Sequence, residues 1–155
     1  ARAQGLTTSL DVGWDPVEAW GRNPHLAPTL AHTDFFFPNE VEAAALSADG
    51  DYEDLAALLG GLLIVKRGAQ GATAYSRDGT ALSVPALSVE VIDTTGAGDA
   101  FNAGFLYAHR VEGVAVVEAM QFAAACGAQA VTQVGGATGA PTADQVRALL
   151  GADQQ

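Results

Sequence analysis

Residues 93–105 read DTTGAGDAFNAGF, and this stretch decides the fold more than any other part of the chain. It follows an alternating apolar run over 87–92, which predicts a β-strand, and it opens a helical pattern with Phe101 and Phe105 on one side. Small residues at a strand-to-helix turn let backbone N–H groups converge on an anion. A carboxylate at Asp99 would normally repel that anion. The pattern therefore predicts a phosphate-binding turn whose acid takes a proton during phosphoryl transfer.

The longer string, Asp93–Leu106, resembles the C-terminal signature of the PfkB carbohydrate kinases, members of the ribokinase-like superfamily. By this resemblance the anion hole for the transferring phosphate consists of Gly96, Ala97 and Gly98. Asp99 is then the catalytic base. A P-loop is excluded, because no Gly-Lys-Ser/Thr follows the turn. The structural alternative is a glycine turn whose acid only complements the helix dipole.

A second motif, PNEVE over 38–42, begins a predicted helix that runs to Leu46. Asn39 as helix N-cap with acids behind it explains these residues without any ligand. The family carries an Asn-x-x-Glu motif at this place in the order, and Asn39 and Glu42 match it. The resemblance implies that Asn39 helps to bind the nucleotide phosphates and that Glu42 helps to position Mg²⁺, usually through water.

The chain has a single lysine, Lys66, at the end of a predicted buried strand over 62–66. In the family this strand end faces the ATP phosphates, often with threonine at the lysine's position. The resemblance thus implies nucleotide contacts by Lys66, Gly68 and Gly71, and a lysine neutralises phosphate charge well. Two plainer explanations stay open: a solvated strand terminus for the lysine, and a tight turn for the Gly-x-x-Gly pattern.

Gln121–Thr132 and the glycine-rich loop after it resemble the closing segment of the family. The resemblance implies that this helix and loop wall the adenine pocket, with Ala124 and Val131 on the adenine side. Ordinary helix packing explains these two residues equally well. Loop carbonyls can join Asp93 and Thr95 in holding a monovalent cation such as K⁺.

Strands that alternate with helices, followed by a run of helices, predict an α/β fold with a largely parallel sheet. The expected order is strands 6–12 and 35–37, helices 39–46 and 52–59, strand 62–66, hairpin strands 72–75 and 81–84, strand 87–92, and helices 97–110, 116–131 and 142–150. The resemblance implies a ribokinase-like three-layer α/β/α architecture. Residues 1–155 are expected to form the C-terminal, nucleotide-binding and catalytic part of such a kinase domain.

This architecture is expected to be incomplete. The family carries most sugar-binding groups and a small β-sheet lid in its first half, and the chain has no counterpart to them. Ala1–Gly5 reads like the last turn of a helix and its glycine cap, without an initiator methionine, so we expect the latter part of something longer. An unpaired sheet edge invites association, which makes a homodimer compatible with the pattern.

The composition of the chain argues against several classes of binding partner. The formal net charge of −11 argues against nucleic acid or an anionic membrane as partner. No apolar run approaches membrane-spanning length and no secretory signal is present, so a cytoplasmic protein is expected. Cys126, the one cysteine, excludes an internal disulfide and is predicted to be a small buried thiol. Trp14 and Trp20 are expected to anchor a loop rather than to cover a sugar.

Together these patterns predict an ATP-dependent carbohydrate kinase that uses Mg²⁺ to phosphorylate a hydroxyl of a sugar or sugar-like molecule. The alternative is a truncated, catalytically inactive remnant that still binds nucleotide. The sequence does not identify the sugar, because the residues that decide it in the family lie in the missing first half.

Overall fold

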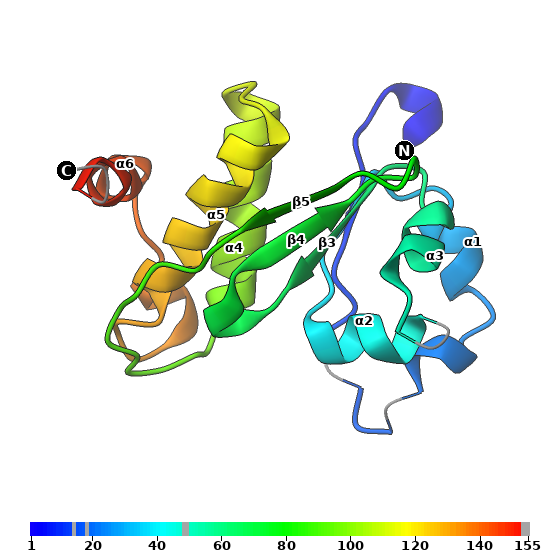
Figure 1. Ribbon diagram of the computed structural model, residues 1–155, viewed down its shortest axis with the longest axis horizontal. Helices are drawn as coiled ribbons and strands as arrows, with labels where there is room; N and C mark the ends of the chain where they lie inside the picture. Colours follow the sequence, from blue (N-terminus) through cyan, green and yellow to red (C-terminus); the bar gives the residue numbers. More distant parts are fainter. Residues whose placement is uncertain (14, 18, 48–49, 153–155) are drawn as a thin grey trace. The chain divides into compact units, whose positions relative to one another are not determined.

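The computed structural model describes residues 1–13, 15–17, 19–47 and 50–152 of the chain (Figure 1). It is a mixed α/β structure with a five-stranded sheet in the order β1-β2-β3-β4-β5. The chain divides into two compact units. Unit 1 consists of residues 1–67 and 73–82, and unit 2 consists of residues 68–72 and 83–155.

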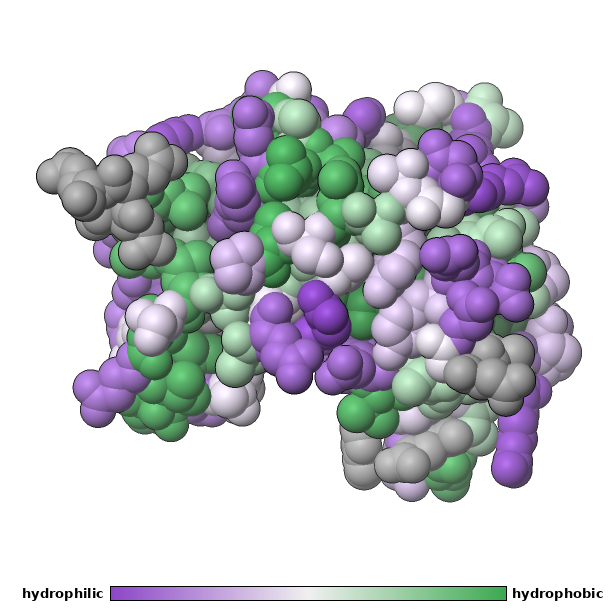
Figure 2. Space-filling model, viewed as in Figure 1, coloured by the Kyte–Doolittle hydropathy of each residue, from purple (hydrophilic) through white to green (hydrophobic). Residues whose placement is uncertain are grey.

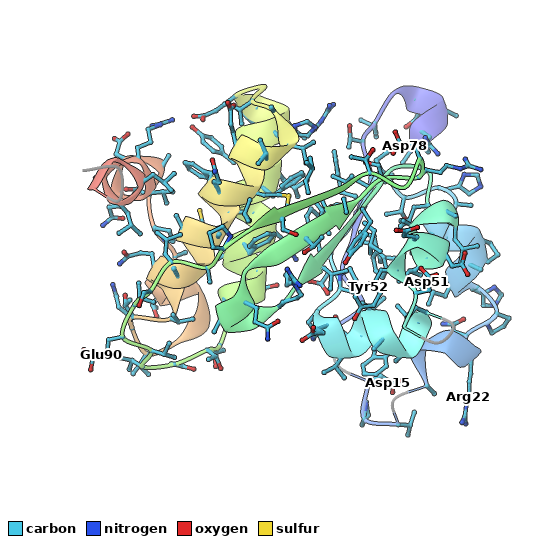
Figure 3. The ribbon with its side chains drawn as sticks, viewed as in Figure 1. Asp15, Arg22, Asp51, Tyr52, Asp78 and Glu90 are labelled. Carbon is cyan, nitrogen blue, oxygen red and sulfur yellow. The ribbon has the colours of Figure 1, made fainter. Side chains whose placement is uncertain are left out.

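The sheet confirms five of the six predicted strands, in the predicted order, but shortens the first two. Its strands are β1 (Ser9–Leu10), β2 (Phe35–Phe36), β3 (Leu62–Lys66), β4 (Ala72–Tyr75) and β5 (Ala81–Val84). Strands β1, β2 and β3 are parallel, with Ser9 beside Phe35 and Phe35 beside Leu62. The predicted hairpin turns at Asp78, labelled in Figure 3, where the Ser76 amide donates to the Thr80 carbonyl at 2.9 Å.

Besides the parallel strands, unit 1 contains short helices. They are η1 (Arg2–Gln4), η2 (Trp20–Arg22), α1 (Leu26–Leu30), α2 (Glu40–Leu46) and α3 (Tyr52–Ala57). The predicted glycine cap after the first turn is confirmed, because Gly5 has a φ of 73°. Helix α1 was not predicted, because Pro28 suggested a loop. Proline is tolerated there because it lies in the first helical turn, where the missing N–H has no partner to lose.

The core of unit 1 forms where these helices pack on the strands. Strand β3 is buried along its middle, with Leu63, Ile64 and Val65 fully covered, as expected for a parallel strand buried on both faces. The main apolar cluster consists of Leu30, Phe36, Ala43, Leu55, Ala56, Leu59, Leu63 and Val65. Trp20 is also buried, and its indole N–H donates to the Gly13 carbonyl at 2.9 Å, so it anchors the loop as predicted. Trp14 lies outside the described residues.

Unit 2 is mainly helical. Its helices are η3 (Gly68–Gln70), α4 (Ala97–Leu106), the π-helical turn η4 (Tyr107–Val111), α5 (Val116–Ala130), η5 (Gly136–Gly139) and α6 (Ala143–Ala152). The predicted cap of the last helix is confirmed, because Thr142 and Gln145 exchange hydrogen bonds, including one of 2.8 Å from the Thr142 amide. The long helix predicted over 97–110 is α-helical only to Leu106 and ends in the π-helical turn.

The strand predicted over 87–92 is wrong, since the structure assigns no strand to these residues. The amides of Ile92 and Asp93 both donate to the carbonyl of Val131, at 2.8 and 3.2 Å, instead of entering a strand ladder. The apolar alternation also fails at its end, because Val91 and Ile92 are exposed. Figure 2 shows apolar residues in several places on the visible face of the molecule.

Helices α4 and α5 lie side by side in unit 2 (Figure 1) and approach closely at Gly104. A Cβ at Gly104 would lie 2.6 Å from the Cys126 sulfur and 3.2 Å from the Cα of Ala123. Cys126 is buried, which confirms the predicted buried thiol, and burial raises the pKa of this thiol to about 11. No helix in the described ranges is long and apolar enough to cross a membrane.

This close approach predicts opposite outcomes for two glycine substitutions in the same helix pair. Gly104→Ala should lower the free energy of unfolding by about 1–3 kcal/mol, because the added methyl overpacks the contact with Cys126. Gly127→Ala meets only ordinary contacts, the nearest being the Ala97 carbonyl at 3.4 Å, and should be neutral or stabilise by up to about 1 kcal/mol through helix propensity. Urea unfolding measures both values. Equal losses in the two variants would contradict the packing account.

Candidate active site

The glycine turn that opens α4 is built for a close backbone approach. Gly96 is the N-cap residue of α4, with a φ of 78°, a conformation that favours glycine. A Cβ at Gly96 would lie 2.8 Å from the Cα of Gly136 in the glycine-rich loop, which leaves no room for it. The turn thus needs glycine both for its backbone conformation and for contact with that loop.

The first turn of α4 offers amide donors and an acid. Within the part of the chain that the structure describes, no side chain caps the start of this helix. The first N–H groups of a helix have no partner inside it, and the helix dipole favours an anion there. Ala97 and Gly98 lie in this turn, and Asp99 follows them with an exposed side chain. The arrangement fits a phosphate at the amides and a proton acceptor beside it.

Asp93 connects the start of this turn to the glycine-rich loop. One carboxylate oxygen accepts from the Thr95 amide at 2.9 Å, and the other accepts from the Gly135 amide at 2.9 Å. The bond from Gly135, followed by those from Thr95, lowers the pKa of Asp93 below its usual value. Asp93 and Thr95, the predicted cation ligands, therefore have a structural function already, and their role toward a cation stays a prediction.

The lowered pKa of Asp93 predicts how stability depends on pH. A carboxylate whose pKa is lower in the folded state stabilises it at pH values above its unfolded pKa, and this contribution disappears as pH falls through the folded value. Asp93→Ala should therefore destabilise the chain at pH 7, with a smaller difference from wild type at pH near 3, because the stabilisation by the ionised carboxylate decreases as pH falls below the usual pKa of an aspartate. Urea midpoints at the two pH values measure the difference.

The control is Glu90→Ala, which removes an exposed carboxylate in the same unit (Figure 3). It should change the midpoint little at either pH. A loss from Asp93→Ala that stays constant down to pH 3 would show that the ionised carboxylate is not what holds the loop.

In unit 1, Asn39 and Glu42 form a reciprocal cap at the start of α2. The Asn39 side chain accepts from the Glu42 amide at 2.9 Å, and the Glu42 side chain accepts from the Asn39 amide at 2.8 Å. The capping role of Asn39 is thus confirmed. Glu42 is only 4% exposed, and this burial raises its pKa, against the hydrogen bond from Asn39. The charge of Asp11 raises this pKa further, whereas that of Lys66 lowers it.

This cluster has the oxygen donors that a magnesium ion needs. Mg²⁺ usually keeps several waters and binds through one or two carboxylates. Glu42 and Asp11 provide two carboxylates, and Asp11 lies close enough for its charge to raise the pKa of Glu42. The residues therefore fit a hydrated magnesium ion, and the metal role of Glu42 remains a prediction.

Lys66 does not end in solvent. It is the last residue of β3, its side chain is 14% exposed, and its ammonium nitrogen lies 2.6 Å from an oxygen of Asp11. The lysine at this strand end is therefore ion-paired, and its contact with nucleotide stays a prediction. Sequence reasoning did not single out Asp11. The available signal was its position just after β1, since the carboxyl ends of parallel strands lie at one edge of the sheet.

The remaining predicted residues have structural reasons of their own. Gly71 has a φ of 90°, and a Cβ there would overlap the Val84 carbonyl, so the approach of β5 requires glycine. Gly68 has a φ of 52° and open space around it. Ala124 and Val131 are buried in unit 2. Their packing explains their residue types, so contacts with nucleotide at these four positions stay predictions.

Comparison with known proteins decides the family. Residues 5–143 match the model of the pfkB family carbohydrate kinases. The chain belongs to the pfkB family. It is 38% identical over 147 residues to an ATP-dependent ribose-1-phosphate kinase of Halopiger xanaduensis, covering 91% of this chain and 46% of that protein. It is 36% identical to the ribokinase of Bacillus subtilis, covering 79% of this chain and 41% of that one.

Solved structures show the same fold. An E. coli protein assigned as a ribokinase II, solved in complex with ATP and Mg²⁺, superposes with a TM-score of 0.82 at 33% identity. The alignment covers 96% of this chain and 50% of that chain. The ribokinase-like α/β fold with a largely parallel sheet is thereby confirmed. This member of the pfkB family spans less than half the length of these two curated relatives, which are among those that it matches.

Proposed function

We propose that this chain is the nucleotide-binding and catalytic part of an ATP-dependent kinase that phosphorylates a hydroxyl of a sugar or sugar-like molecule. The observation that carries the proposal is the turn at the start of α4, where Gly96 closes on Gly136 and the first helical amides stand next to Asp99. Membership of the pfkB family and the similarity to a protein solved with ATP and Mg²⁺ support it.

In the proposed reaction, the amides of Ala97 and Gly98 bind oxygens of the transferring phosphoryl group. Such donors stabilise developing charge without rearranging during the reaction, because the fold has already oriented them. Asp99 accepts the proton of the acceptor hydroxyl as its oxygen forms a bond to the γ-phosphorus of ATP and the bond to the ADP oxygen breaks. The products are the phosphorylated acceptor, ADP and a proton that Asp99 releases to water.

The proposal assigns the other phosphate and metal contacts to unit 1. Asn39 and Lys66 would bind phosphate oxygens. The carboxylate of Glu42 would hold a hydrated magnesium ion through its water ligands. When bound, Mg²⁺ neutralises charge on the phosphate oxygens and so favours attack at phosphorus. Asp93 and Thr95, with carbonyls of the glycine-rich loop, are proposed to hold a monovalent cation such as K⁺. A homodimer and a cytoplasmic location stay predictions.

Turnover is best tested on the product of the complete reading frame. A panel of ribose, ribose 1-phosphate, fructose, 2-keto-3-deoxygluconate and adenosine should include at least one acceptor that is phosphorylated in a reaction that needs both ATP and Mg²⁺. Binding of Mg-ATP without transfer to any acceptor would contradict the kinase proposal and support the inactive nucleotide-binding remnant. Intact mass, compared with the encoded length, establishes which chain is measured.

A further inference from the structure

Asp11 and Lys66 form an ion pair in unit 1, and the reaction proposed above gives Asp11 no role in it. The ammonium of Lys66 donates to a carboxylate oxygen of Asp11 at 2.6 Å, across 55 positions of sequence. Asp11 directly follows β1, and Lys66 ends β3. Strands β1, β2 and β3 are parallel, so both residues lie at the carboxyl edge of the sheet, where ligands of open α/β sheets bind.

The pair differs from an ordinary surface ion pair. Exposed pairs contribute little, because water solvates both charges and two long side chains must be ordered. Here the Lys66 side chain is 14% exposed and that of Asp11 is 30% exposed. A free lysine side chain carries about 2 kcal/mol of rotamer entropy. In this structure the side chain of Lys66 is held in one place before any ligand binds.

The backbone also fixes Lys66 beside the predicted phosphate and metal residues. The Lys66 amide donates to the Pro38 carbonyl at 2.9 Å, and Lys66 forms a parallel bridge with Asn39. Asn39 in turn is joined to Glu42 by the reciprocal cap. The ammonium therefore stands among the side chains to which the proposed function assigns the metal and the phosphates.

We propose that Asp11 is a positioning residue whose carboxylate holds the Lys66 ammonium at this edge as a resident cation for the nucleotide phosphates. This inference rests on the proposed function, which supplies the polyphosphate ligand. An ammonium carries three N–H donors, so a bond to one oxygen of Asp11 leaves donors for phosphate oxygens. Protein kinases use such a device, in which a strand lysine that binds phosphates is paired with a glutamate.

Whether removal of the Asp11 charge weakens or tightens the binding of a polyphosphate distinguishes positioning of Lys66 from simple charge repulsion. If Asp11 only added negative charge, its removal would tighten the binding of a polyphosphate, because like charges repel. If Asp11 orients Lys66, its removal loosens binding, because the lysine must be ordered at the moment of association. Asp11→Asn keeps the size of the side chain and removes the charge. We expect it to weaken the binding of inorganic triphosphate about tenfold in metal-free buffer.

The single lysine makes the measurement specific. Labelling the 155-residue chain with ¹³C-lysine gives one Cε cross-peak, from Lys66. Inorganic triphosphate should shift this cross-peak saturably, and in Asp11→Asn the same shift should need about ten times more triphosphate. Asp11→Glu, which keeps a carboxylate, should bind within about threefold of wild type. Glu53→Gln, which neutralises an exposed acid on α3, should bind within about twofold.

Lys66→Met gives a second readout through calorimetry, because it keeps the length of the side chain and removes the cation. It should weaken triphosphate binding at least about tenfold. Circular dichroism establishes that each variant is folded. Unchanged or tighter binding in Asp11→Asn, or unchanged binding in Lys66→Met, overturns the inference and leaves the proposed function standing. Binding of Mg-ATP without binding of triphosphate also overturns the inference and leaves the proposed function standing. A chain that binds neither Mg-ATP nor triphosphate overturns both the inference and the proposed function.

Discussion

Asp99→Asn is expected to lower kcat for phosphoryl transfer by about 10²- to 10⁴-fold in the protein from the complete reading frame. Asparagine has nearly the same size as aspartate but cannot accept the proton of the attacking hydroxyl. The affinity for Mg-ATP should be unchanged or slightly higher, because the carboxylate in the first turn of α4 repels phosphate rather than binding it. Steady-state kinetics with a saturating acceptor, together with calorimetry, separates the two parameters.

The matched control is Glu118→Gln, which neutralises an exposed acid in the first turn of α5, the neighbouring helix of the same unit. It removes the same charge from the same kind of position and should leave kcat within about twofold. A kcat for Asp99→Asn within about threefold of wild type would show that another group accepts the proton.

Gly96→Ala is expected to destabilise the chain by about 2–4 kcal/mol, because alanine is strained at a positive φ and its methyl would also collide with the backbone of Gly136. Relief of that collision must displace either the start of α4 or the glycine-rich loop. The affinity for Mg-ATP should fall at least about tenfold, because the first-turn amides lose their alignment. Urea unfolding and calorimetry measure the two losses.

Gly113→Ala distinguishes the effect of backbone strain at a positive φ from the effect of collision with the glycine-rich loop. Gly113 has a φ of 75°, close to that of Gly96, but a Cβ there meets nothing within 4 Å. Its substitution should cost only about 1 kcal/mol of backbone strain and leave nucleotide affinity unchanged. Equal losses of stability in Gly96→Ala and Gly113→Ala would mean that contact with the glycine-rich loop contributes nothing.

Features that depend on a few neighbouring residues could be predicted from the sequence. The caps at Asn39 and Thr142 and the hairpin turn at Asp78 follow from local hydrogen bonds that polar side chains make with nearby amides. The order of strands and helices follows from apolar periodicity. The motif at residues 93–106 indicated the family, which the comparisons confirm.

Features that depend on distant partners could not be predicted. The run over 87–92 alternates like a strand, but its last amides find a carbonyl at the end of α5 instead of a neighbouring strand. Asp11 and Lys66 meet only because the parallel strands bring their carboxyl ends to one edge. Gly71 reads like part of a phosphate motif, whereas its surroundings show a close approach of Val84. In each case the sequence contains both partners but does not show that the fold brings them together.

Calorimetric titration of Mg-ATP into the 155-residue chain measures whether its residues form a nucleotide site. Saturable heat is expected, with a Kd of about 1 mM or tighter, equivalent to at least about 4 kcal/mol of binding free energy. Binding should weaken when EDTA removes Mg²⁺, and Gly113→Ala should bind like wild type. Heat no different from dilution at about 10 mM Mg-ATP, with the chain folded by circular dichroism, would contradict the claim that these residues form a nucleotide site.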